Sequence, residues 1–160
     1  MDKSQKQVKS FHEKYGLTTK GTPDLGTDVG VRILRSNLIH EELAELNAAL
    51  MSNDLVEVAD ALGDLLYVVY GAAVSFGIDM EPVFDEIHRT NMLKDGGGNR
   101  ADGKVSKPAD WQPPRIREIL DAQIKDWDIP RSINDLRRNL CLCSPTNYGK
   151  FPCGCNVTVD

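Results

Sequence analysis

Apolar residues recur at intervals of three and four along most of the first 95 positions, a spacing that predicts helices. In residues 2–15, Val8, Phe11 and Tyr15 follow this spacing in a polar background, and Gly16 comes next as a helix terminator. Residues 31–52 repeat the pattern over a longer stretch, with acidic residues between the apolar ones. The sequence therefore predicts a short and a long amphipathic helix, joined by an irregular, glycine-rich crossing segment over residues 17–30.

The most apolar stretch of the chain is residues 55–76, which follows the turn and N-cap residues Ser52, Asn53 and Asp54. A helix that is apolar on almost every side is expected to be central and buried. A fourth helix is predicted over residues 80–92, with Pro82 tolerated in its first turn. We therefore expect an all-α fold in which four helices pack as a bundle.

Beyond the fourth helix the pattern weakens. Residues 95–114 are rich in Gly, Asp, Lys and Pro and are expected to be irregular, and a short helix is predicted over residues 116–125. We divide the chain into one domain over residues 1–116 and an irregular C-terminal extension over residues 117–160.

Composition narrows the class of protein. The 160 residues carry a formal net charge of -5, which argues against a non-specific nucleic-acid surface. The chain has no run of 18 apolar residues and no apolar signal segment near residue 1, so we expect a cytoplasmic protein without a membrane span. All the cysteines lie in the last 20 residues, which fits a reducing compartment. They are Cys141, Cys143, Cys153 and Cys155.

Carboxylates cluster on the two central helices. Glu41, Glu42 and Glu45 lie on one helix, and Glu57 and Asp60 lie at i, i+3 on the next. Like charges at this spacing repel by roughly 0.2 to 0.5 kcal/mol per pair on an exposed helix, so a cation is expected among them. A solvated acidic face is the alternative.

Asp60 and Asp64 interrupt the most apolar helix, where a bare buried carboxylate is costly. Two helices joined by a tight turn run antiparallel, so the two acidic faces meet and offer a set of hard oxygen ligands. Mg²⁺ is the matching ion, with Mn²⁺ as the alternative.

The order Glu41-Glu42-x-x-Glu45, an eleven-residue gap and Glu57-x-x-Asp60 resembles the signature of all-α nucleoside triphosphate pyrophosphohydrolases. This superfamily includes MazG-like proteins, dimeric dUTPases and phosphoribosyl-ATP pyrophosphohydrolase. Three flanking segments, residues 60–71, 86–94 and 102–111, look like the phosphoribosyl-ATP pyrophosphohydrolase branch. The resemblance covers about residues 8–116.

The resemblance implies roles for individual residues. Glu42, Glu45, Glu57 and Asp60 are implied as the Mg²⁺ ligands, and Asp64 is a possible substitute for one of them. Glu41 is implied as a further ligand or as a base that orients water, beside Glu42 and Glu45 in the catalytic set. The implied substrate-binding residues are Asn91, Lys94, Lys104 and Lys107.

The sequence departs from the family pattern at Leu93, where a leucine replaces a small hydroxyl residue next to Lys94. The implied reaction is attack of water on the α-phosphorus of a nucleoside triphosphate, giving a nucleoside monophosphate and pyrophosphate. A covalent intermediate is disfavoured because the predicted core holds no cysteine. The resemblance also implies a homodimer or homotetramer.

The sequence also allows three further interpretations. A carboxylate-bridged di-iron bundle has a single imperfect acid and imidazole pair, Asp85-x-x-His88. A catalytically idle binding or regulatory subunit of the same fold is the main functional alternative. The terminal Cys-x-Cys pairs offer four thiolates to Zn²⁺, but their spacing differs from the usual C-x-x-C.

Overall fold

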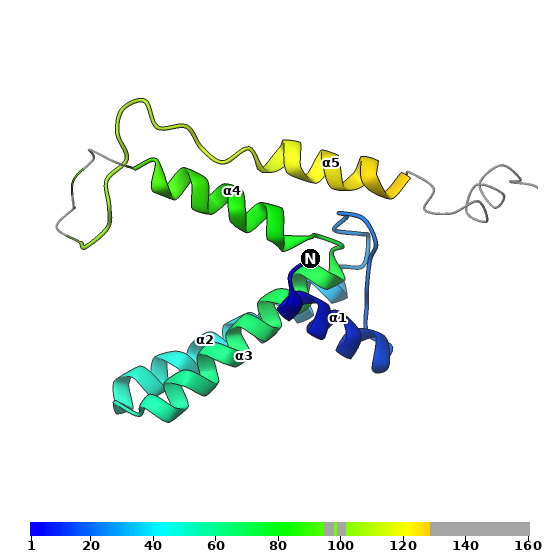
Figure 1. Cartoon of the computed structure of the whole chain (residues 1–160). Helices are drawn as coiled ribbons and strands as arrows, with labels where there is room; N and C mark the ends of the chain where they lie inside the picture. The colour runs from blue at the N-terminus through cyan, green and yellow to red at the C-terminus, as the bar shows by residue number, and fades with distance from the viewer. Residues whose placement is uncertain (95–97, 99–101, 129–160) are drawn as a thin grey trace, which may run out of the picture. The chain divides into compact units, whose positions relative to one another are not determined.

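The computed structural model describes residues 1–94, 98 and 102–128. These residues form five helices and no extended strand (Figure 1). The helices are α1 (Lys3–Lys14), α2 (Val29–Ser52), α3 (Leu55–Ser75), α4 (Met80–Met92) and α5 (Ile116–Asp128). The all-α prediction is confirmed, and the helix bounds agree with those expected from the apolar spacing to within three residues.

Aspartate begins each of the first four helices. The side chains of Asp2, Asp28, Asp54 and Asp79 accept hydrogen bonds from backbone N–H groups of the first turn that have no partner within the helix. Between α2 and α3, Asn53 takes a left-handed conformation with φ 55°, which reverses the chain within two residues. The result is a tight antiparallel pair of helices.

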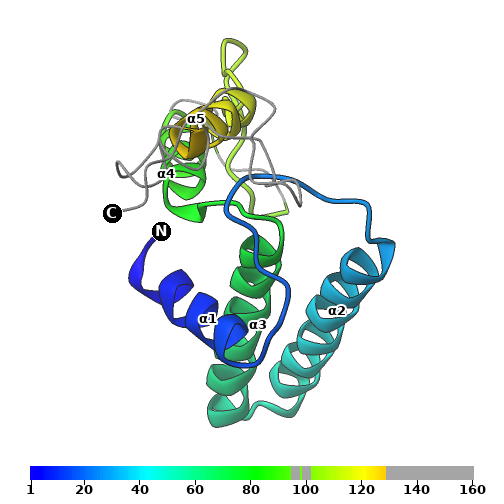
Figure 2. The same cartoon turned by 90° about the vertical axis from the view of Figure 1, so that its right-hand side faces the viewer.

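The α2–α3 pair carries the acidic residues, and α1 packs across α3 (Figures 1 and 2). Small residues lie at the α2–α3 contact, where Ala49 and Ala61 are buried. Their short side chains let the two backbones approach closely. Val8 of α1 and Val74, close to the end of α3, are almost fully buried.

The prediction that α3 is buried on all sides is wrong for a single chain. Its last residues, 71–75, are buried or half-buried, but Leu55 is 80% exposed and Leu66 is 60% exposed. On α4, Val83 is buried, whereas Phe84 and Met92 are largely exposed. The sequence pattern marks these positions as apolar, yet the described part of the chain supplies nothing that covers them.

The segment before α2 is held on the end of α3. The backbone N–H groups of Lys20 and Asp24 donate to the carbonyls of Val74 and Phe76 at 3.1 and 2.9 Å. Gly77 has φ +70°, and a Cβ at this position would lie 2.1 Å from the Thr22 carbonyl oxygen. Glycine is therefore required both for the turn and for the close approach of this segment.

The junction of α3 and α4 is fixed by two glutamine side chains. Gln5, fully buried, donates to the Ile78 carbonyl and accepts from the Met80 N–H. Gln123 of α5 exchanges a similar pair of hydrogen bonds with the Asp79 backbone, both at 2.9 Å. Residues 1–127 form one compact unit that includes α5. The predicted domain boundary after residue 116 stays a prediction, and the four cysteines lie outside the described residues.

Candidate active site

An acidic hollow of about 390 Å³ lies between α2 and α3 near the turn that joins them. Glu45 reaches it from α2, and Glu57 and Asp60 reach it from α3. The rest of its wall is formed by Ala48, Ala49, Ala61 and Ser52. Because these side chains are short, the helices leave a space that is bordered by carboxylates. Three of the four predicted metal ligands therefore share one hollow.

The fourth predicted ligand, Glu42, belongs to the same negative cluster. Its pKa is raised, first by loss of hydration and then by the charges of Glu45, Asp64, Glu41 and Asp60, in that order. Glu41 and Glu45 are neighbours of Glu42 on α2, whereas Asp60 and Asp64 of α3 act on it because the two helices pack together. The structure thus assembles the whole acidic set that the sequence singled out, and concentrates negative charge there.

The donor set suits a hard divalent cation. All the candidate ligands are carboxylate oxygens, and a cation would relieve their mutual repulsion. Within the described residues, no three acidic, histidine or cysteine side chains converge closely enough to hold an ion. Asp60 and Asp64 are exposed, so the expectation that water is excluded from them is wrong for a single chain. The carboxylates border the space rather than closing on one point.

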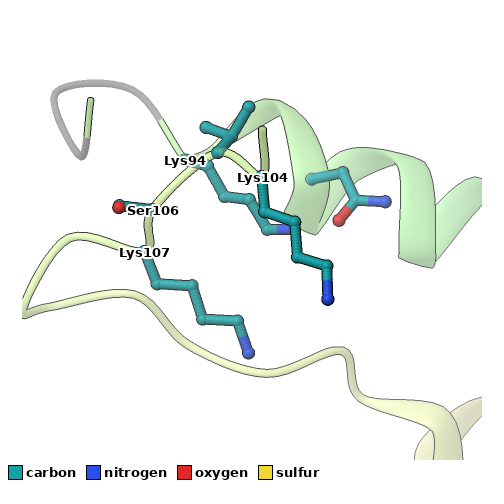
Figure 3. Close-up of a pocket in the computed structure, with 6 residues that line it drawn as sticks. Lys94, Lys104, Ser106 and Lys107 are labelled. Carbon is teal, nitrogen blue, oxygen red and sulfur yellow. The ribbon is translucent and has the colours of Figure 1, made fainter. Parts of the chain in front are cut away.

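A second hollow, of about 670 Å³, brings together all four predicted substrate-binding residues. Asn91 and Lys94 come from the end of α4, and Lys104 and Lys107 come from the loop that follows. Figure 3 shows the three lysine side chains extending from the two segments toward the same space. Among the described residues neither Lys94 nor Lys104 forms an ion pair, so both ammonium groups are available to an anion.

Trp111 and Glu86 hold this loop on α4. The Trp111 indole N–H donates to the Thr90 carbonyl at 2.8 Å, one of the last carbonyls of α4, which have no partner within the helix. Glu86 accepts from Arg89 and from the Arg115 backbone N–H at 2.9 Å. The hydrogen bonds from Arg89 and Arg115 lower the pKa of Glu86 to about 2.

Two residues in the wall of the lysine hollow, Val105 and Ser106, were not singled out from the sequence as site residues. Leu93, which replaces the small hydroxyl residue of the family pattern, is 54% exposed. Lys107 places its ammonium group 3.9 Å from the centre of the Trp111 ring, a cation–π contact that orients the lysine. The sequence of the segment 102–111 alone gives no sign of these placements.

In one chain the two hollows are separate. The acidic hollow lies by the α2–α3 turn, at the end of α3 remote from α4, and the lysine hollow lies beyond the far end of α4. They share no lining residue. The described residues therefore assemble each predicted group of side chains but do not bring the two groups together.

Comparison with known proteins identifies the family. The phosphoribosyl-ATP pyrophosphohydrolase family model matches residues 8–91, more than half of the chain. The chain belongs to the phosphoribosyl-ATP pyrophosphohydrolase family. This places it among the pyrophosphohydrolases of the MazG-like all-α superfamily, and the matched residues contain the whole acidic set. Of the lysine hollow, the match includes only Asn91.

A relative is found in Acanthamoeba polyphaga mimivirus. An uncharacterised protein of this virus is 52% identical to the chain over 48 residues. The match covers 30% of this chain and 19% of the viral protein, so the chain spans about a fifth of that relative.

Proposed function

We propose that this chain is a Mg²⁺-dependent nucleoside triphosphate pyrophosphohydrolase that cleaves between the α- and β-phosphates. The products are a nucleoside monophosphate and pyrophosphate. The observation that carries the proposal is the gathering of six carboxylates on the paired helices α2 and α3, in a member of a pyrophosphohydrolase family. Control or sanitising of the nucleotide pool is the role that fits such a reaction.

Glu42, Glu45, Glu57 and Asp60 are the residues proposed to hold the ion. A bound Mg²⁺ supplies neutralisation of the phosphate oxygens in the transition state. Glu41, next to Glu42 on α2, is proposed to orient the attacking water and to accept its proton. Lys94 and Lys104 contribute point charges to the triphosphate oxygens. Asn91 donates to or accepts from a phosphate or base edge of the same nucleotide.

Assembly of two or more copies is part of the proposal, as a homodimer or homotetramer. Leu62, Leu66 and Val69 form an exposed apolar stripe at helical spacing on α3, and Met51 and Leu55 extend the exposed apolar surface at the α2–α3 turn. Such surfaces on soluble proteins mark contacts with another protein. Burial of this stripe by a second copy would also allow a lysine hollow to approach a partner's acidic hollow.

A membrane is the alternative environment for the exposed apolar residues of α3, because this helix is long and apolar enough to span one by length and composition. Its Glu57, Asp60 and Asp64 carboxylates argue against that reading, because each is costly in hydrocarbon. A protein partner can leave them facing water or an ion. We therefore propose a cytoplasmic assembly without nucleic acid or membrane as a partner.

The activity is tested by incubating the protein with each common dNTP and NTP, with and without Mg²⁺, and separating pyrophosphate from orthophosphate. Metal-dependent pyrophosphate release that is lost in Glu45→Gln and Asp60→Asn supports the proposal. Glu13→Gln, an exposed change on α1, is the matched control. Orthophosphate as the only product places the cut at another bond and contradicts the proposal.

A catalytically idle subunit of the same fold is the alternative, and it predicts no product from any nucleotide. Assembly is measured separately, by light scattering after size-exclusion chromatography. Leu66→Glu is expected to lower the molar mass to that of one chain, and Gln7→Glu, on the exposed surface of α1, is expected to leave it unchanged. A single-chain mass for the unmodified protein rules out the assembly.

A further inference from the structure

An exposed cluster of three aromatic rings lies where α1 packs on α3. Phe11 and Tyr15 of α1 are 40% and 57% exposed, and Tyr67 of α3 is 39% exposed. The centre of the Phe11 ring lies 4.6 Å from that of Tyr15 and 5.6 Å from that of Tyr67. Val8, one turn before Phe11, is 2% exposed, so the apolar face of α1 is buried at Val8 and opens to solvent at the rings. The aromatic cluster is therefore a surface feature rather than part of the core.

Tyr67 lies on the same face of α3 as two carboxylates of the acidic set. Asp60, Asp64 and Tyr67 follow one another at i, i+4 and i+7, which is the spacing of one helix face. At 1.5 Å per residue, Tyr67 lies about 10 Å along the helix from Asp60 and about 4.5 Å from Asp64. The aromatic cluster thus continues the acidic face away from the α2–α3 turn. Its separation from the carboxylates is comparable with the span from the α-phosphate to the base of a nucleotide.

The other surfaces near the acidic residues do not offer a ring in this way. Toward the α2–α3 turn, the acidic hollow is lined by Ala48, Ala49 and Ser52, which are small. The apolar stripe of α3, which is proposed to contact a second copy, lies on a different side of the helix from Tyr67 at 3.6 residues per turn. Assembly through that stripe therefore does not require the aromatic cluster to be covered.

The geometry of the rings leaves room for a flat ligand. The planes of Phe11 and Tyr67 are nearly perpendicular, at 84°, so the edge of one ring meets the face of the other. This contact leaves at least one face of each ring uncovered. Lys14 holds its ammonium group 5.1 Å from the centre of the Tyr15 ring, which occupies one face of that ring. Tyr67 therefore combines an exposed ring with a position next to the carboxylates.

We propose that the aromatic cluster is the nucleobase subsite, where the base stacks on Tyr67 and Phe11 supports that ring. The inference rests on the proposed function, because it takes the phosphates to lie at the acidic residues. Every nucleobase has an aromatic face, so stacking on a side-chain ring is tolerant of base identity. The ligand class is therefore nucleotides of more than one base. The proposal gives α1, which holds none of the proposed catalytic residues, a part in binding the substrate.

The test separates binding of the base from binding of the phosphates. Dissociation constants are measured by isothermal titration calorimetry with Mg²⁺ for the α,β-methylene analogues of ATP and UTP, whose α–β bridge is not hydrolysed. Inorganic tripolyphosphate, which has the phosphates without a base, is the third ligand. The proteins are the unmodified protein, Tyr67→Leu, Tyr67→Phe and Phe84→Leu. Phe84 is an exposed ring on α4 and serves as the matched control.

We expect Tyr67→Leu to weaken the binding of both analogues by about fivefold or more, the effect typical of removing a stacked ring. Its affinity for tripolyphosphate should not change. Tyr67→Phe keeps the ring and should retain the affinity for the analogues, as should Phe84→Leu. In the unmodified protein, base protons of the analogues should show nuclear Overhauser effects to the Tyr67 ring, a measurement that does not depend on the folding of any variant.

Several results overturn the inference. These are unchanged affinity for the analogues in Tyr67→Leu, an equal loss for tripolyphosphate, the same loss in Tyr67→Phe or Phe84→Leu, or no Overhauser effect between the base and the Tyr67 ring. Failure of the analogues to bind the unmodified protein also overturns it. A protein that stacks the base on Tyr67 but releases no pyrophosphate refutes the proposed function and leaves the base subsite standing. Pyrophosphate release with unchanged analogue affinity in Tyr67→Leu has the opposite meaning.

Discussion

The hydrogen bond from Trp111 to Thr90 allows a quantitative test of how the lysine loop is held. Trp111→Phe removes the indole N–H but keeps an aromatic ring under Lys107. The change leaves the Thr90 carbonyl at the end of α4 without its 2.8 Å partner, in a residue that is 2% exposed. Loss of one such bond costs about 1 kcal/mol, which lowers the equilibrium constant for docking of the loop about fivefold.

The expected kinetic result is a KM for nucleoside triphosphate higher by up to about fivefold, with kcat changed less than twofold, because the lysines are the proposed substrate-binding residues and the acidic residues remain in place. Hydrogen exchange of the backbone amides in residues 102–111 should rise in the same variant. Gln112→Ala is the control, since Gln112 is exposed and, within the part of the chain that the structure describes, its side chain bonds only to the Asp110 carbonyl. An unchanged KM together with faster exchange would show that the loop does not serve the substrate.

Three other changes test the scaffold. Glu86 has a folded-state pKa of about 2 against an ordinary 4.5, so its contribution to stability is present above about pH 4.5 and is lost as the pH falls toward 2; the urea midpoint of Glu86→Gln should therefore depend less on pH over this interval. Gly77→Ala should destabilise the protein by more than about 1 kcal/mol in urea unfolding, because alanine is strained at φ +70° and its Cβ would collide with the Thr22 carbonyl. Asp54→Ala should lower the free energy of unfolding by about 1 kcal/mol, because the α3 N-cap is lost, and should therefore lower the melting temperature. An unchanged melting curve would show that the cap is dispensable.

Local chemistry made the helices predictable from the sequence. Apolar spacing marked every described helix, and Asp54 with the adjacent Asn53 marked the tight turn that makes α2 and α3 antiparallel. Because side chains three and four residues apart share a helix face, that turn was sufficient to predict the meeting of the acidic faces. The pKa of Glu42 is raised mainly by loss of hydration, and the charges of Asp64 and Asp60 on α3 add to the shift.

Contacts between distant segments were decided only by the tertiary structure. The sequence pattern of α3 predicted burial on all sides, but apolar spacing does not say whether the cover comes from the same chain or from another molecule. The attachment of Trp111 to Thr90 and the place of Ser106 in the wall of the lysine hollow depend on loop paths that have no periodicity to reveal them. The sequence therefore determined the helices and the acidic set, and the packing of irregular segments determined which further side chains join a site.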